Sequence, residues 1–102
     1  MRLAVIGDYE SPTYQELLER VTIIFPGEQA LDLSRHKAEA WKTLADARLQ
    51  DIDSAHTVII CGDWSAHVDA RVDITRAQAL KKECFIEIDG RFLPFPEYAK
   101  RW

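Results

Sequence analysis

Residues 55–80 read AHTVIICGDWSAHVDARVDITRAQAL, and this one segment indicates the architecture of the whole chain. An apolar, largely β-branched run from Thr57 to Cys61 predicts a buried strand, which Gly62 ends. A polar turn follows, and then a helix with acidic residues in its first turns. In open α/β sheets, ligands bind where such strand–turn–helix units leave the carboxyl edge of the sheet. We therefore expect the functional site at this edge.

The composition is that of an ordinary globular protein, with 102 residues of which 47% are hydrophobic and 29% are charged. This length predicts a single domain, residues 1–102, with a modest core. The formal net charge of −4 argues against a nucleic-acid partner, since a phosphate backbone requires clustered lysines and arginines. No apolar run approaches the roughly 20 residues of a membrane span, and the start has no signal-peptide layout. We therefore expect a cytoplasmic protein that binds neither nucleic acid nor membranes.

The cysteines and histidines are isolated in the sequence. Cys61 and Cys84 each fall in a predicted strand without CxxC spacing, which indicates reduced core thiols. His36, His56 and His67 have no second ligand three or four residues away, which argues against a metal site. The sequence also contains no glycine-rich dinucleotide motif, phosphate-binding loop or Gly-x-Ser-x-Gly elbow. We expect neither a metal nor another cofactor.

Strands and helices alternate along the rest of the chain. Ser11-Pro12 predicts a helix start, because serine is a preferred N-cap and proline is favoured in the first helical turn. Ser34 is interpreted as the cap of a longer helix, whose apolar residues follow at helical spacing up to Ile52. Asp89-Gly90 predicts a tight hairpin. The predicted strands are 3–6, 22–25, 57–61, 84–88 and 91–93.

This β-α-β-α-β-α-β-β order predicts a small flavodoxin-like three-layer α/β sandwich. Alternating strands and helices imply a parallel sheet with right-handed crossovers and helices on both faces. We expect strand order 2-1-3-4, with the antiparallel C-terminal strand at an edge of the sheet.

The helix after residue 67 has two apolar columns where a surface helix needs only one. A second column favours an additional contact beyond the sheet, and the aromatic-rich segment from Phe92 to Trp102 favours the same interpretation. We therefore expect a homodimer or a higher homo-oligomer. The columns are Val68, Val72 and Ala79, and Ala70, Ile74 and Ala77.

Two loops define the expected site. The predicted strand order places Gly7-Asp8-Tyr9 beside Gly62-Asp63-Trp64, where the strand order reverses and a crevice opens. Glycines there let backbone N–H groups approach a phosphate or a ribose, and Tyr9 or Trp64 is suited to stack on a base. The alternative is that the glycines only permit tight turns and that the aromatic rings cap the core.

Asp69 and Asp73 lie one helical turn apart and so share a face. Two carboxylates in a cleft are suited to act as nucleophile and acid, or to shift each other's pKa. The alternative for Asp69 is a solvated helix start that the helix dipole favours. The alternative for Asp73 is an ion pair with Arg76 or Arg71.

Trp64-Ser65, followed by Ala70-Arg71-Val72-Asp73, resembles the nucleoside 2-deoxyribosyltransferase-like superfamily, and above all its short uncharacterised bacterial and phage members. The family pattern is a strand, a Gly-Trp turn and Ser-x-Gly-Ala-Arg-x-Glu at the start of a helix. The resemblance implies a nucleoside, nucleotide or related ribosyl compound as ligand. It covers residues 55–80 best, and nearly the whole chain by order of strands and helices.

The resemblance also implies roles for single residues. Asp73 matches the glutamate that attacks the sugar carbon bearing the base. His67 and Asp69 match the serine and glycine that receive a 5′-phosphate or a sugar hydroxyl, and Arg71 is expected near the phosphate or paired with Asp73. The family's base-contacting acid falls near Arg48, with Asp46 the closest acid.

Three of these positions depart from the family pattern. Asp73 is one methylene shorter than glutamate, Asp69 replaces a glycine, and Arg48 cannot act as an acid. Gly7-Asp8-Tyr9 matches the loop that lines the sugar site, and Gly62 and Trp64 match the Gly-Trp turn. Three functions therefore stay open: an enzyme that cleaves or transfers an N-glycosidic bond, a non-catalytic nucleotide sensor, and a structural interaction module.

Overall fold

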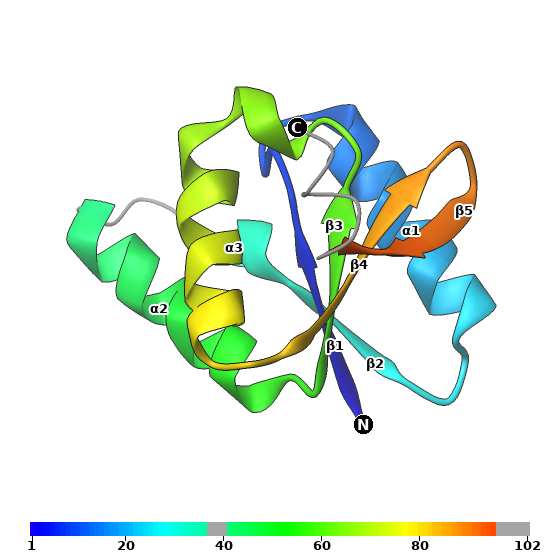
Figure 1. Cartoon of the computed structure of the whole chain (residues 1–102), viewed down its shortest axis with the longest axis horizontal. Helices are drawn as coiled ribbons and strands as arrows, with labels where there is room; N and C mark the ends of the chain where they lie inside the picture. Colours follow the sequence, from blue (N-terminus) through cyan, green and yellow to red (C-terminus); the bar gives the residue numbers. More distant parts are fainter. Residues whose placement is uncertain (37–40, 96–102) are drawn as a thin grey trace.

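The structure, a computed structural model, describes residues 1–36 and 41–95 and contains one five-stranded sheet in the order β2-β1-β3-β4-β5 (Figure 1). The first four strands are parallel, and the last runs antiparallel at the edge. This arrangement confirms the predicted strand order and is consistent with a flavodoxin-like sandwich. The strands are β1 (Arg2–Ile6), β2 (Gln29–Asp32), β3 (Thr57–Cys61), β4 (Glu83–Ile88) and β5 (Arg91–Pro94).

Helices cover both faces of the sheet, because alternate side chains of the central strands point to opposite sides. On one face, Leu3, Val5 and Ile59 pack against α1 (Pro12–Ile24). On the other, residues of β1, β3 and β4 pack against α2 (Trp41–Ser54) and α3 (Val68–Ala79). Two short 3₁₀ turns, η1 (Leu33–Arg35) and η2 (Trp64–Ala66), lead into α2 and α3. Within the described ranges, no helix has both the length and the apolar character that crossing a membrane requires.

The predicted strand at residues 22–25 is wrong, because α1 continues through Ile24. Its last turns are held by helical hydrogen bonds, and the Thr22 hydroxyl also donates to the Leu18 carbonyl over 2.9 Å. Ile23 is 76% exposed, so the apolar run there is not a buried strand. The second strand is instead β2, which pairs with β1 from Arg2 and Gln29 onward.

The predicted helix cap at Ser34 is also wrong. Ser34 lies within η1, where its N–H donates to the Asp32 carboxylate over 3.0 Å. The later part of the predicted helix is confirmed as α2, in which Ile52 is fully buried. Ala38 of the predicted apolar stripe falls outside the described residues.

The hairpin is confirmed. Asp89 and Gly90 have φ values of 50° and 81°, the left-handed pair that a tight turn between antiparallel strands needs. The free thiols of Cys61 and Cys84 are both buried, on opposite faces of the sheet.

In α3, one predicted apolar column, Ala70, Ile74 and Ala77, is buried. The other is not, since Val68 is 60% exposed. The helix also packs against α2 of the same chain, which supplies a second contact without another copy. The homo-oligomer stays a prediction.

Candidate functional site

A cleft of about 920 Å³ opens at the carboxyl ends of β1 and β3, the two neighbouring strands between which the crossover direction changes. One wall is the loop after β1 with the start of α1, another is η1 with α2, and the third is the segment that leads into α3. The lining residues are 7–12, Gln15, Ser34, His36, Leu44, Arg48 and 66–69.

Gly7 lets the loop after β1 lie directly on β3. A Cβ at this position would approach the Cys61 Sγ to 2.5 Å and its Cβ to 2.8 Å, which no ordinary packing allows. The close approach carries the next residues across the carboxyl edge, so that Tyr9 reaches the helix layer on the other face. Gly7 therefore allows this loop to pack closely on β3.

Tyr9, Arg48 and Asp73 form a buried hydrogen-bonded network beside the cleft. The Tyr9 hydroxyl donates to Asp73 Oδ2 over 2.6 Å, and Arg48 Nε donates to the same oxygen over 2.8 Å. The Arg48 guanidinium carbon lies 5.1 Å from the centre of the Tyr9 ring, within range of a cation–π interaction. Asp73 has no exposed surface, whereas Tyr9 and Arg48 line the cleft. The two therefore separate the Asp73 carboxylate from the cleft.

Burial dominates the electrostatics of this network. Loss of solvent raises the pKa of Asp73, while the hydrogen bond from Tyr9 and the charge of Arg48 act against that rise. Burial, with the negative charge of Asp73, also raises the pKa of Tyr9 well above its ordinary value. Tyr9 therefore stays protonated at neutral pH and acts as a donor.

The network leaves two buried polar atoms without hydrogen bonds among the described residues, Asp73 Oδ1 and Arg48 Nη2. Arg48 Nη2 lies 3.8 Å from Asp69 Oδ1, close enough for an ion pair but too far for a hydrogen bond. Buried polar groups in folded proteins are almost always hydrogen-bonded. A donor left over beside a cleft is available to a ligand.

Histidines connect the walls of the cleft. His67 Nε2 lies 3.5 Å from Asp8 Oδ2 and 3.9 Å from Asp63 Oδ2, so it links the loops after β1 and β3. His36 Nε2 lies 2.8 Å from Asp51 Oδ2, which ties the segment after η1 to α2. Within residues 1–36 and 41–95, no group of three or more potential ligands is arranged to hold a metal ion.

The structure brings together only part of the predicted site. Gly7, Asp8, Tyr9, His67 and Asp69 all line the cleft, as expected from adjacent loops.

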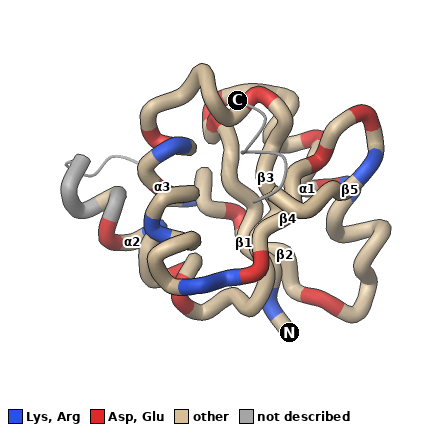
Figure 2. The backbone as a smooth tube through the Cα atoms, in the orientation of Figure 1, with Lys and Arg blue, Asp and Glu red and all other residues tan. Residues whose placement is uncertain are grey.

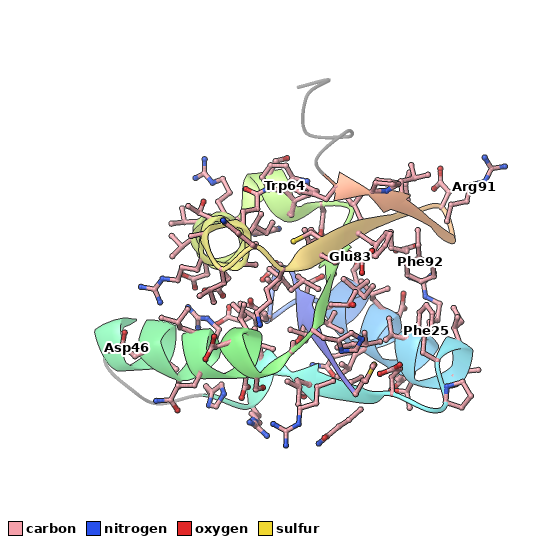
Figure 3. All side chains as sticks on the ribbon, turned by 60° about the horizontal axis from the view of Figure 1, so that its bottom comes forward. Phe25, Asp46, Trp64, Glu83, Arg91 and Phe92 are labelled. Carbon is pink, nitrogen blue, oxygen red and sulfur yellow. The ribbon has the colours of Figure 1, made fainter. Side chains whose placement is uncertain are left out.

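Besides Asp73, four other predicted residues lie outside the cleft lining. Trp64 packs edge-on against Phe95, with ring centres 5.2 Å apart, and contacts the core. Gly62 lines a separate depression, where a Cβ would meet the Glu87 carbonyl oxygen at 2.9 Å. Asp46 is exposed on α2, far from Trp64 in the view of Figure 3, and Arg71 is exposed on α3. The positions of these residues are determined by how their helices and strands pack, which the sequence motif alone does not specify.

Asp73 pairs with Arg48 of α2, not with Arg71 or Arg76 of its own helix. The sequence held a signal for this partner, because Arg48 lies one turn before Ile52 and so on the buried face of α2. A cation on an apolar helix face needs a buried partner. His36 was missed as a lining residue, because its position depends on η1 and no local pattern marks it.

Comparison of the chain with protein-family models finds no match, and a search among curated proteins finds no similar sequence. The fold and the site define a class only: a small α/β domain with a polar cleft at the carboxyl edge of its sheet.

Proposed function

We propose that this domain binds a nucleoside, a nucleotide or a related ribosyl compound in the cleft at the carboxyl ends of β1 and β3. The observation that carries the proposal is the combination of the Tyr9 ring with Arg48 Nη2, a buried nitrogen without a hydrogen bond among the described residues, at a cleft of about 920 Å³. That volume lies in the range of small-molecule sites, which combine a ring surface with a few placed polar groups. The resemblance to nucleoside 2-deoxyribosyltransferases supports the same class of ligand.

Cleavage or transfer of an N-glycosidic bond is the reaction that this proposal includes. A carboxylate oxygen of Asp73 would attack the sugar carbon that bears the base, the C–N bond would break, and the base would leave with its electron pair and take up a proton. Water or a second base would then release the sugar. Because Tyr9 and Arg48 both bind Asp73 Oδ2, the attacking oxygen is Oδ1, and the two side chains must shift to admit the sugar.

A non-catalytic ligand-binding module is the second candidate. The complete burial of Asp73 favours it, because a carboxylate covered by two donors serves to position Tyr9 and Arg48. A homo-oligomer with the exposed Val68 at its contact, in a reducing cytoplasmic setting that suits the two free thiols, completes the proposal.

The test is a panel of ribonucleosides and deoxyribonucleosides with their 5′-monophosphates. We expect one ligand class to raise the melting temperature, since a ligand at a hundred times its Kd adds about 2.7 kcal/mol of stability. Tyr9→Phe keeps the ring but removes the hydroxyl, and it should weaken binding. Asp53→Asn, an exposed change on α2, is the control that should bind normally.

Release of free base from the same panel separates the two candidates. Release that is lost in Asp73→Asn supports the enzyme, and binding without release supports the module. If no member of the panel binds the folded protein, the proposed ligand class is wrong.

A further inference from the structure

The hydrogen-bond ladder between β1 and β2 is interrupted at the end that borders the cleft. Where the two strands begin to pair, the N–H of Gln29 donates to the Met1 carbonyl over 2.8 Å. This pattern repeats at every second residue of a parallel pair, so the N–H of Leu33 would be the next to donate to the Val5 carbonyl. The Tyr14 hydroxyl takes that place instead: it accepts the Leu33 N–H over 3.0 Å and donates to the Val5 carbonyl over 2.9 Å. A side chain of α1 is therefore inserted between the two strands.

The inserted hydroxyl lies in an apolar interior. Val5 and Leu33 are fully buried, and Tyr14 is 1% exposed. From Leu3 to Ile6, β1 carries no charged side chain (Figure 2). Burial raises the pKa of Tyr14 well above its ordinary value, so the hydroxyl keeps its proton and is both a donor and an acceptor. Both backbone groups rely on this hydroxyl, since a buried polar group without a hydrogen bond is costly.

Tyr14 also supports the wall of the cleft that carries Tyr9. The two rings pack edge to face, with centres 5.1 Å apart and planes at 79°. A Cβ on Gly7 would lie 3.4 Å from Tyr14 Cδ2, so the loop after β1 rests on the Tyr14 ring at two positions. One buried side chain thus joins β1, the start of η1 and the loop after β1.

The next residue of α1 holds the same 3₁₀ turn. Gln15 Nε2 donates to Ser34 Oγ over 3.1 Å, so α1 contacts η1 through two successive residues. Gln15 and Ser34 line the cleft, as does His36 directly after η1. The position of η1 relative to β1 therefore determines where this wall of the cleft stands.

We propose that Tyr14 is a positioning residue for the ligand site: its inserted hydroxyl keeps η1 apart from β1, and this separation sets the width of the cleft. The inference rests on the proposed function and extends it to a residue that does not line the cleft. Without the hydroxyl, the Leu33 N–H and the Val5 carbonyl would bond directly, at about 2.9 Å. The wall that carries Ser34 and His36 would then move toward β1.

Tyr14→Phe tests the inference, because it removes the hydroxyl and keeps the ring. Titration calorimetry uses each nucleoside or nucleotide that raises the melting temperature of the native chain. We expect Tyr14→Phe to bind these ligands at least about tenfold more weakly, a difference of about 1.4 kcal/mol. Val21→Ala is the matched control, since Val21 is a fully buried residue of the same helix outside the lining. It should destabilise the fold by leaving a cavity, and the folded protein should keep native affinity.

Two further measurements separate positioning from a simple loss of stability. In the crystal structure of Tyr14→Phe, we expect Leu33 N within hydrogen-bond distance of Val5 O and Ser34 displaced toward β1. The substitution Tyr14→para-aminophenylalanine places another donor between the strands, and this variant should bind more tightly than Tyr14→Phe.

Native affinity in Tyr14→Phe would overturn the inference, as would an unmoved η1 in its crystal structure. An equal loss of affinity in Val21→Ala, or no gain with para-aminophenylalanine, would also count against it. If no nucleoside or nucleotide binds the native chain, the proposed function fails, and the crystal structure still decides whether Tyr14 sets the position of η1.

Discussion

Two carboxylate–arginine pairs join helices to the rest of this domain, and they are built differently. The Glu87 carboxylate of β4 accepts hydrogen bonds from both terminal nitrogens of Arg20 on α1, over 3.3 and 3.2 Å. It accepts a third from the N–H of Gly90 over 2.8 Å. Each of its oxygens therefore has a donor. Asp73 of α3 takes two donors on one oxygen and none on the other, and Arg48 keeps an unbonded nitrogen.

Exposure makes this difference informative. The Arg20 side chain is 45% exposed, so water solvates whatever the protein leaves unbonded. The Arg48 and Asp73 side chains are 4% and 0% exposed, so each of their polar atoms without a hydrogen bond carries the full free-energy cost of desolvation. A chain that keeps such a pair beside a cleft gives up stability at that place, as functional sites commonly do. The Glu87–Arg20 pair joins β4 to α1, whereas the Asp73–Arg48 pair lies beside the candidate site.

Removal of the Asp73 carboxylate should have the largest effect on stability. Asp73→Ala leaves the Tyr9 hydroxyl and Arg48 Nε without an acceptor, and each unsatisfied buried donor costs about 1–3 kcal/mol. We expect a loss of about 2–6 kcal/mol in the free energy of unfolding, measured by urea denaturation. Asp73→Asn retains one acceptor oxygen and should lose less than half as much. A loss below about 1 kcal/mol for Asp73→Ala would show that the network is not formed.

The loop that carries Tyr9 should give the next largest effect. Gly7→Ala forces a methyl group against Cys61, and overpacking of this kind typically costs about 1–3 kcal/mol. The chemical denaturation midpoint should fall, and Cys61→Ala in the same chain should recover part of the loss. If the two changes are simply additive, the contact between Gly7 and Cys61 does not set the position of the loop.

The Glu87–Arg20 pair should matter less. Glu87→Gln removes the charge but keeps an amide oxygen, and half of the arginine side chain already contacts solvent. We expect a loss of about 1 kcal/mol in the free energy of unfolding and no change in ligand affinity. A clear loss of ligand binding by folded Glu87→Gln would remove the distinction between the two pairs.

The pH dependence of stability gives the smallest expected signal. Because burial raises the pKa of Asp73, the folded chain holds this proton more tightly than the unfolded chain, in which aspartate titrates near about 3.9. Asp73 therefore stabilises the fold most below that pH, and its contribution falls as the pH rises through the raised pKa. The free energy of unfolding of the native chain minus that of Asp73→Asn should decrease between about pH 3.5 and pH 7. An increase would mean that Arg48 and Tyr9 lower the pKa instead.

Much of the fold could be predicted from local patterns, because strong turn signals agree with the strands that they bound. Ser11-Pro12, Thr57–Cys61 and Asp89-Gly90 each act through a few neighbouring residues. The prediction of a strand at residues 22–25 was wrong, because the β-propensity of branched residues takes effect only where a sheet can pair with them. Here the preceding helix simply continued, and the less apolar Gln29–Asp32 paired with β1.

The candidate site was less predictable, because its contacts join distant parts of the chain. Strand order alone brought Asp8, Tyr9 and His67 to one edge. Asp73 and Arg48 are 25 residues apart in the sequence, and their pairing depends on how α2 packs against α3. The motif around Asp73 instead favoured partners on the same helix. Trp64 was expected to contact the ligand, but its ring packs against Phe95, and no sequence spacing predicts that contact.

The buried Cys61 thiol lies against Gly7, so its reactivity reports on the loop after β1. Burial raises the pKa of Cys61 to about 12, and the residue is 1% exposed, so an alkylating reagent reaches the thiol only when its cover opens, of which the loop at Gly7 is a part. In a Cys84→Ser background, the alkylation rate of Cys61 therefore measures how often the structure around this thiol opens. A ligand that holds the loop after β1 against β3 should lower that rate, whatever the chemistry of the ligand.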